Sequence, residues 1–288
     1  MYLSKMRRIC IRCRGYIRKR AMELQIEDEK EQRGIQSIEV GGQILVVLAD
    51  SGGPMTLKQL AVQAKMTPAK AHPYLVSFGK IGLVAQDPVS GRYGLGALAL
   101  RMGLAGLRQL NPVRLAMAAA VELEQKIHHT VALSVWGNAG PTVIHLEESS
   151  HPIHMNLRPG TVMSLTTATG KIFGAYMPAR KMERFVEESM HPHAIPHVIG
   201  ALRNWKDMQR DLQEVREHGL ARAIGQPIAG VSAFAAPVFD HNGHLSIVLT
   251  IVGPTGGFDP DWTCANAQAL RDCANRISTQ MGFATVDS

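Results

Sequence analysis

The sequence lacks any uninterrupted apolar run near the roughly 18 residues that a membrane-spanning helix requires. The longest apolar stretches, ILVVLA at 44–49 and LSIVLTIVG at 245–253, have the length of buried strands or of one helix face. We therefore expect no transmembrane helix. Cysteine is also scarce: the four residues are scattered, which is typical of a protein of the reducing cytoplasm. Cys264 and Cys273 are interpreted as buried thiols.

Catalytic signatures are missing as well. The chain has no nucleophile-elbow motif that would mark a triad of serine, histidine and acid. TATGKI at 167–172 lacks the glycine spacing of a phosphate-binding loop, and no Ser or Thr follows its lysine. We predict that the protein is not an enzyme and needs no cofactor.

Two groups of metal-ligating residue types are present, but neither has the pattern of a metal site. Cys10 and Cys13 have CxxC spacing without a second ligand pair nearby. The twelve histidines include HPHAIPH at 191–197, with His151 and His154 upstream. Because a proline-rich loop does not hold ligands in a fixed geometry, we expect a solvated loop there and no metal.

The formal net charge of +7 is concentrated at the N-terminus. Residues 1–20 hold eight Lys or Arg and no acid, which leaves 23 basic and 24 acidic side chains in the rest of the chain. Residues 34–110 carry a net charge of +4 and residues 111–288 a net charge of −2, as expected when only the first module meets phosphate. Residues 1–33 are predicted to be a disordered charged extension. Translation from Met22 and a phosphate-binding basic arm are the alternatives.

The next module, residues 34–96, has the element order of a winged helix-turn-helix. Helical patterns at 35–50 and 56–64 precede a third at 68–79. GLVAQD and RYGLG then predict a hairpin around the turn PVSG. In this arrangement the third helix lies in the DNA major groove and the hairpin reaches over the adjacent backbone.

Thr67 is expected to cap the third helix and Pro68 to open it, whereas Pro73 is expected to kink it or to delay its start. Small residues near its N-terminus let the backbone approach base edges, and a lysine there can reach a base or a phosphate. The candidate DNA contacts are Thr67, Ala69, Lys70, Ala71, His72, Tyr74 and Arg92. The side predicted to be buried consists of Leu75, Val76 and Phe78, packed on Leu60 and Val47. The alternative is that this segment merely forms a small helical core.

Residues 97–111 predict a helix that is apolar almost all round, and Asn111–Pro112 is the capped start of another helix. We interpret 97–111 as a linker helix that pairs with a copy of itself. Burial of this helix within its own subunit is the alternative.

From residue 130 the apolar period changes to two, so residues 112–284 are predicted to form an α+β domain with a largely antiparallel sheet and flanking helices. The predicted strands are 130–136, 141–149, 153–157, 220–224, 231–240 and 245–253. The predicted helices are 168–177, 179–189, 204–219 and 261–281. His145, in the second strand, is interpreted as a packed core histidine.

Three segments together give the chain a resemblance to IclR-type bacterial transcriptional regulators, from about Ile35 to Gly282. They are SGRYGLG at 90–96, SLTTATGK at 164–171 and GVSAFAAPVFDHNGHLSIVLTIVGP at 230–254. The resemblance implies an N-terminal DNA-binding domain, a linker helix and a GAF-like C-terminal domain that binds a small effector. It also implies dimers or tetramers that act on short, often palindromic operators.

The resemblance places an effector site around SLTTATGK. Residues 166–170 would open onto a helix N-terminus, whose free N–H groups attract anions. Ala168 and Thr169 fall where members of the family contact small organic acids such as glyoxylate or pyruvate, and sheet residues complete the pocket. The candidate effector-binding residues are Thr167, Ala168, Thr169, Gly170, Ser232, Ala233, Thr250 and Val252. Helix capping by the first two threonines, and a Thr250 hydroxyl bonded within its sheet, are the alternatives.

Two departures from the family pattern affect these expectations. Where the family has a basic residue near HPY at 72–74, this chain relies on Lys70 and His72. Where the family has acids before GVSAFAAP, this chain has AIGQPIA at 223–229, so no carboxylate contact to the effector is predicted there.

The function favoured by these patterns is a ligand-responsive repressor or activator of transcription, in which an effector shifts the dimer between arrangements that match or mismatch two DNA half-sites. The alternative is a small-molecule sensor with weakened or lost DNA binding. An enzyme built on the α+β domain is the third reading, without a motif in its favour.

Overall fold

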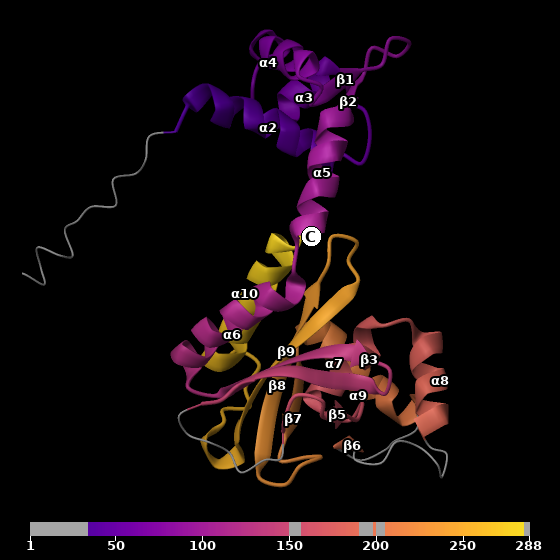
Figure 1. Cartoon of the computed structure of the whole chain (residues 1–288), viewed down its shortest axis with the longest axis vertical. Coiled ribbons are helices and arrows are strands. Elements are labelled where there is room, and N and C mark those ends of the chain that lie inside the picture. Colours follow the sequence, from indigo (N-terminus) through magenta and orange to yellow (C-terminus); the bar gives the residue numbers. More distant parts are fainter. Residues whose placement is uncertain (1–33, 150–156, 190–197, 200–204, 285–288) are drawn as a thin grey trace, which may run out of the picture. The chain divides into compact units, whose positions relative to one another are not determined.

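The computed structural model describes residues 34–149, 157–189, 198–199 and 205–284 (Figure 1). The chain divides between Arg108 and Gln109 into two compact units. Within the described ranges, no helix has the length and apolar character needed to cross a bilayer.

The first unit is the winged helix-turn-helix that the sequence predicts. Its helices are α2 (Gln36–Asp50), α3 (Leu57–Gln63) and α4 (Pro68–Lys80). The antiparallel wing strands β1 (Val84–Gln86) and β2 (Tyr93–Leu95) follow, and then α5 (Ala97–Gln109).

Local capping sets the two helices of the turn. The Thr56 hydroxyl accepts a hydrogen bond from Gln59 N at 3.3 Å, and the Gln59 side chain accepts one from Thr56 N at 2.9 Å, so that a capping box starts α3. Thr67 caps α4 in the predicted way: its hydroxyl accepts from Lys70 N at 3.3 Å, and Pro68 is the first helical residue. The helix starts at Pro68 and continues through Pro73, so that, of the two expectations for Pro73, the late start is wrong.

The core of the first unit lies between α2, α3 and α4 and includes Ile44, Leu60 and Leu75. Phe78 packs against it as predicted, but Val76 remains 43% exposed, and its predicted burial is wrong. The reason is helical geometry, because one residue beyond the buried Leu75 the side chain has turned about 100° away from the core.

The second unit is an α+β domain built on one seven-stranded sheet. Its strand order is β6-β5-β4-β3-β9-β8-β7, antiparallel throughout except for the parallel pair β5 and β6. The strands are β3 (Thr130–Gly137), β4 (Gly140–Glu147), β5 (Val162–Met163), β6 (Val198–Ile199), β7 (Ala221–Ile224), β8 (Val231–Phe239) and β9 (Leu245–Pro254). The helices are α6 (Pro112–Ile127), α7 (Ala168–Tyr176), α8 (Ala179–Ser189), α9 (Trp205–His218) and α10 (Ala265–Gln280), with a 3-10 turn at Thr255–Gly257.

Helices cover both faces of this sheet. On one face α6 and α10 lie side by side and form a core with alternate residues of the central strands, such as Leu133, Phe234 and Ile251 (Figure 1). On the other face α7, α8 and α9 pack over the intervening residues, such as Ala235 and Val248. The period of two that predicted these strands therefore reflects two separate apolar cores.

The second unit departs from the predicted elements at α10 and at two short strands. Helix α10 begins at Ala265 instead of residue 261, because Cys264 is its N-cap and its Sγ accepts a hydrogen bond from Ala267 N at 3.4 Å. Strands β5 and β6 were not predicted, since two residues are too short to display a period. Most of the predicted strand 153–157 lies outside the described residues.

Candidate functional site

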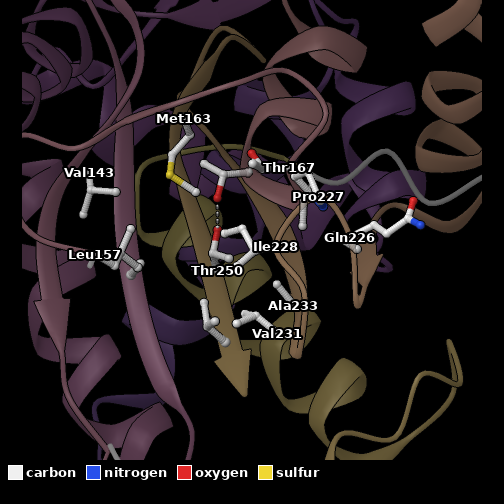
Figure 2. A pocket seen from close by; sticks show the side chains of 15 residues that line it. Val143, Leu157, Met163, Thr167, Gln226, Pro227, Ile228, Val231, Ala233 and Thr250 are labelled. Carbon is white, nitrogen blue, oxygen red and sulfur yellow. Dashed lines mark hydrogen bonds between the residues drawn. The ribbon is translucent and has the colours of Figure 1, made fainter. Parts of the chain in front are cut away.

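A small pocket lies in the second unit, on the sheet face covered by α7 (Figure 2). Its lining residues come from β3, β4, β5, β7, β8 and β9, from the start of α7, from the segment between β7 and β8 and from the segment before β5. They are Ala132, Val143, Leu157, Met163, Thr167, Ala168, Thr169, Ala223, Gln226, Pro227, Ile228, Val231, Ala233, Thr250 and Val252.

Two buried threonines link the helix to the sheet in this pocket. The Thr169 and Thr250 hydroxyl oxygens lie 2.8 Å apart and share a hydrogen bond, dashed in Figure 2, in which either oxygen can donate. Thr169 is in the first turn of α7, and Thr250 lies on β9 at the register position beside Ala132 of β3. Each of the two side chains is 2% exposed.

Thr167 starts α7. Its hydroxyl accepts a hydrogen bond from Gly170 N at 3.0 Å and donates one to the Ser164 carbonyl at 2.8 Å. The hydroxyl thus acts as the helix cap.

The pocket is predominantly apolar. Thr167, Thr169, Thr250 and Gln226 are its polar lining residues, and none of the fifteen carries a charge. A bound molecule would therefore place an apolar body against Val, Leu, Met and Ile side chains and one small polar group near the threonine pair.

Six of the eight candidate effector residues line the pocket: Thr167, Ala168, Thr169, Ala233, Thr250 and Val252. Ser232 does not, because alternation along β8 turns it away from the face that carries Val231 and Ala233. Its hydroxyl donates to Thr255 Oγ1 at 2.9 Å and accepts from Gly225 N at 3.3 Å.

Gly170 is also absent from the lining, and its role is steric. A Cβ at this position would collide with the backbone of Ser164 and Leu165. Glycine therefore lets α7 approach that backbone closely, which brings Thr167 and Thr169 to the pocket.

Sequence reasoning missed the other nine lining residues. Ala132 could have been found from strand alternation, since it is the neighbour of Thr250 across β3 and β9. The segment Gln226–Ile228 gave only a local signal, a proline between two glycines. Nothing in the sequence placed Val143, Leu157 or Met163 on the opposite wall, which Figure 2 shows facing Pro227.

A second, more open hollow adjoins the pocket and shares Ala223, Gln226 and Pro227 with it. Its charged lining residues pair with one another. Lys171 Nζ lies 3.5 Å from Asp211 Oδ2, and Arg222 Nη2 lies 3.4 Å from Glu214 Oε1. The hollow therefore offers no excess charge of either sign.

The residues of the first unit that were predicted to contact DNA differ in how far they are buried. Thr67, Ala69, Lys70, His72 and Arg92 are exposed. Tyr74 is half-buried and packs against the core, close to Gly41 of α2.

Ala71 is completely buried, so its predicted DNA contact is wrong: it faces the core from the inner side of α4. Arg92 lies on the wing, where its Nη1 donates a hydrogen bond to the Pro54 carbonyl at 3.3 Å.

Metal-ligating residues do not gather in the described part of the chain, which holds no group of three or more His, Cys, Asp or Glu side chains suited to an ion. HPHAIPH at 191–197, His151, His154, Cys10 and Cys13 lie outside the described residues.

The structure also describes the surroundings of His145, Cys264 and Cys273. His145 is not fully packed, since 24% of its side chain is exposed and its Nε2 lies 3.4 Å from Glu147 Oε2. Cys273 is buried, and burial raises the pKa of its thiol, whereas Cys264 is only half-buried.

Two protein-family descriptions match the chain. Residues 105–279 match the bacterial transcriptional regulator IclR C-terminal domain, and residues 37–88 match the IclR helix-turn-helix domain. Together they cover α3, α4, β1 and nearly all of α2 in the first unit, the end of α5, and most of the second unit.

Individual relatives are similar over most of their length. The glycerol operon regulatory protein of Streptomyces coelicolor is 27% identical over 266 residues, which are 87% of this chain and 98% of that protein. The HTH-type transcriptional regulator KdgR of Dickeya chrysanthemi is 25% identical over 228 residues, which are 79% and 74% of the two chains. The crystal structure of Pseudomonas aeruginosa HmgR is 33% identical, with a TM-score of 0.76, over 88% of this chain and 100% of that one.

Proposed function

The chain belongs to the IclR family of bacterial transcriptional regulators, and from this we propose that a small organic acid in the pocket of the second unit modulates its binding to operator DNA. Proteins of this family are regulators of transcription and not enzymes, and the same holds for this chain.

The observation that carries the proposal is the hydroxyl pair of Thr169 and Thr250 at the pocket wall. The two hydroxyls bond only to each other, so both can rotate toward the cavity and donate hydrogen bonds to one carboxylate. Because no charged residue lines the pocket, this carboxylate would otherwise be left unsolvated. The first turn of α7 adds backbone N–H groups and the positive end of its dipole.

The lining residues also determine which kind of acid fits, through its part other than the carboxylate. Ala168, Ala233, Val252, Leu157 and Met163 offer only apolar contacts, so that Gln226 is the one polar side chain of the lining besides the threonines. An acid with an aliphatic or aromatic body would bury that body here, at about 25 cal/mol per Å² of apolar area removed from water. Glyoxylate and pyruvate have little apolar area to contribute.

The assembly we propose is a homodimer or homotetramer that contacts itself through α5. Among the described residues of this helix none is buried. Leu100, Leu104 and Leu107 lie at spacings of four and three, which puts them on one side of the helix, and each is at least 40% exposed. A symmetric pair of such helices would remove this surface from water and would set the distance between two DNA-reading units.

The effector would act by a shift of population. A ligand that binds one arrangement of the dimer better than another favours that arrangement by its difference in affinity. Operator binding then changes because the two copies of α4 must match half-sites one or more helical turns, about 34 Å each, apart.

One observation favours a second candidate function, a ligand-binding sensor that no longer reads DNA. Pro73 lies in the middle of α4 and is exposed, so the helix lacks one backbone hydrogen bond and has no long polar side chain at that position.

A melting-temperature screen with carboxylic acids, followed by DNA-binding titrations, tests the proposal. Acids with apolar bodies should raise the melting temperature, by an amount equivalent to about 2.7 kcal/mol when the acid is present at 100 times its Kd. Thr250→Val should reduce the shift strongly, whereas Ser232→Ala, outside the pocket, should change it little. Equal shifts in the wild type and in Thr250→Val would contradict the site. Ligand binding without any sequence-specific DNA binding would favour the sensor.

A further inference from the structure

The outward face of α4 is apolar over most of its length. Ala71 and Leu75, which are 0% and 2% exposed, mark its buried side. With 3.6 residues per turn, the opposite side carries Ala69, Pro73, Val76 and Lys80. All four are exposed, and only the last, at the C-terminal end, has a hydrogen-bond donor.

The neighbouring hydroxyl does not change this character. Ser77 Oγ donates to the Pro73 carbonyl at 2.9 Å, so its hydrogen is used inside the helix. The centre of the face thus presents methyl and ring CH groups. A helix that hydrogen-bonds to base edges would present an amide or a guanidinium group there.

The charge of the helix-turn-helix segment favours duplex DNA as the occupant of this face. Lys58, Lys65, Lys70 and Lys80 are all exposed, and no Asp or Glu occurs from residue 51 to residue 86. An apolar strip on a helix that also carries Lys70 and Lys80 complements a groove floor between two phosphate backbones. Binding of an apolar protein partner would not require lysines without any neighbouring Asp or Glu.

Thymine is the base that such a strip can recognise, because its C5-methyl group is the apolar feature of the major-groove edge. From residue 69 to residue 76 the helix rises about 10 Å, which is about three base-pair steps of 3.4 Å. We propose that Ala69, Pro73 and Val76 read thymine methyl groups within about three successive base pairs of each half-site. This inference rests on the proposed DNA-binding function.

The test begins with selection of duplexes from a random-sequence library by the full-length protein. Each thymine of the enriched half-site is then replaced singly by deoxyuridine, which removes the methyl group and leaves the Watson–Crick edge intact. For wild-type protein we expect about fourfold weaker binding at each contacted thymine, the value for one apolar carbon returned to water.

The variant Val76→Ala tests which of the contacted thymines Val76 recognises. At one thymine the deoxyuridine effect should fall from about fourfold to about none in this variant, while the other positions keep theirs. Val46→Ala, the same change at an exposed valine of α2, should retain the full wild-type pattern. If Val76→Ala were unstable, the wild-type deoxyuridine series would still decide.

Three outcomes are distinct. A deoxyuridine effect that Val76→Ala abolishes at one position supports the proposal. Enriched half-sites without thymine, or deoxyuridine duplexes that bind as tightly as their thymine parents, would overturn methyl reading while DNA binding stands. Failure to enrich any sequence would overturn the proposed function itself.

Discussion

The hydroxyl oxygens of Thr169 and Thr250 lie 2.8 Å apart although 81 residues separate them in the chain. The contact joins the first turn of α7 to the central strand β9 and forms part of the pocket wall. Because both side chains are buried, any change in this pair affects folding and ligand binding together.

Thr250→Val should destabilise the second unit by about 1–3 kcal/mol, because it leaves the Thr169 hydroxyl buried without a partner. Thr169→Val should do the same, and the double variant should cost clearly less than the sum of the two. Denaturant titration measures this well, since all three tryptophans, Trp136, Trp205 and Trp262, lie in this unit and report its unfolding. Fully additive costs would mean that the hydroxyls do not stabilise each other.

Gly170→Ala should destabilise the second unit by about 1–3 kcal/mol and weaken ligand binding, since the added methyl group meets the backbone of Ser164 and Leu165. The matched control is Gly256→Ala, in the same unit, where an added Cβ meets no atom within 4 Å. The control should retain wild-type ligand affinity. Wild-type stability in Gly170→Ala would refute the close approach of α7 to that backbone.

Lys70→Ala should weaken DNA binding on all sequences alike and should lower the slope of log K against log salt by about 0.9, as expected for one lost phosphate contact. Anisotropy titrations at several salt concentrations give this slope. Lys126→Ala, an equal change of charge on α6, should leave it unaltered. An unchanged slope together with altered sequence preference would show that Lys70 contacts a base instead.

Leu104→Glu should dissociate the assembly, because a charge on the shared side of α5 would have to be buried in it. Sedimentation of the full chain measures the change in mass. Met102→Glu serves as the control, since Met102 is 58% exposed but lies about 160° from Leu104 around the helix axis. A variant of Leu104 with the wild-type mass would exclude α5 as the interface.

Most of the correct predictions came from local sequence patterns. The cap at Thr67 and the period of two in β8 and β9 act within a few residues, and the structure retains them. The cap at Thr167, which was the alternative to an effector contact, is also present. The predicted burial of Val76 and the predicted DNA contact of Ala71 were wrong, because a proline-containing helix pattern did not define which side faces the core.

The pocket could be predicted only in part for a related reason. Thr169 and Ala233 belong to segments with recognisable patterns, whereas Leu157 and Gln226 reach the cavity from irregular segments whose position depends on tertiary packing. Periodicity contains no information about such segments. The apolar character of the lining therefore became visible only when the strands and these segments were brought together.

The coupling between pocket and DNA is the central claim, and its most direct test is the Kd of the full-length protein for a selected duplex, measured without and with a saturating acid from the melting-temperature screen. We predict a change of about 5–150-fold, the usual range of allosteric coupling, and the same factor in the Kd of the acid when the duplex is saturating. Equal DNA affinities with the pocket empty and filled would contradict the account.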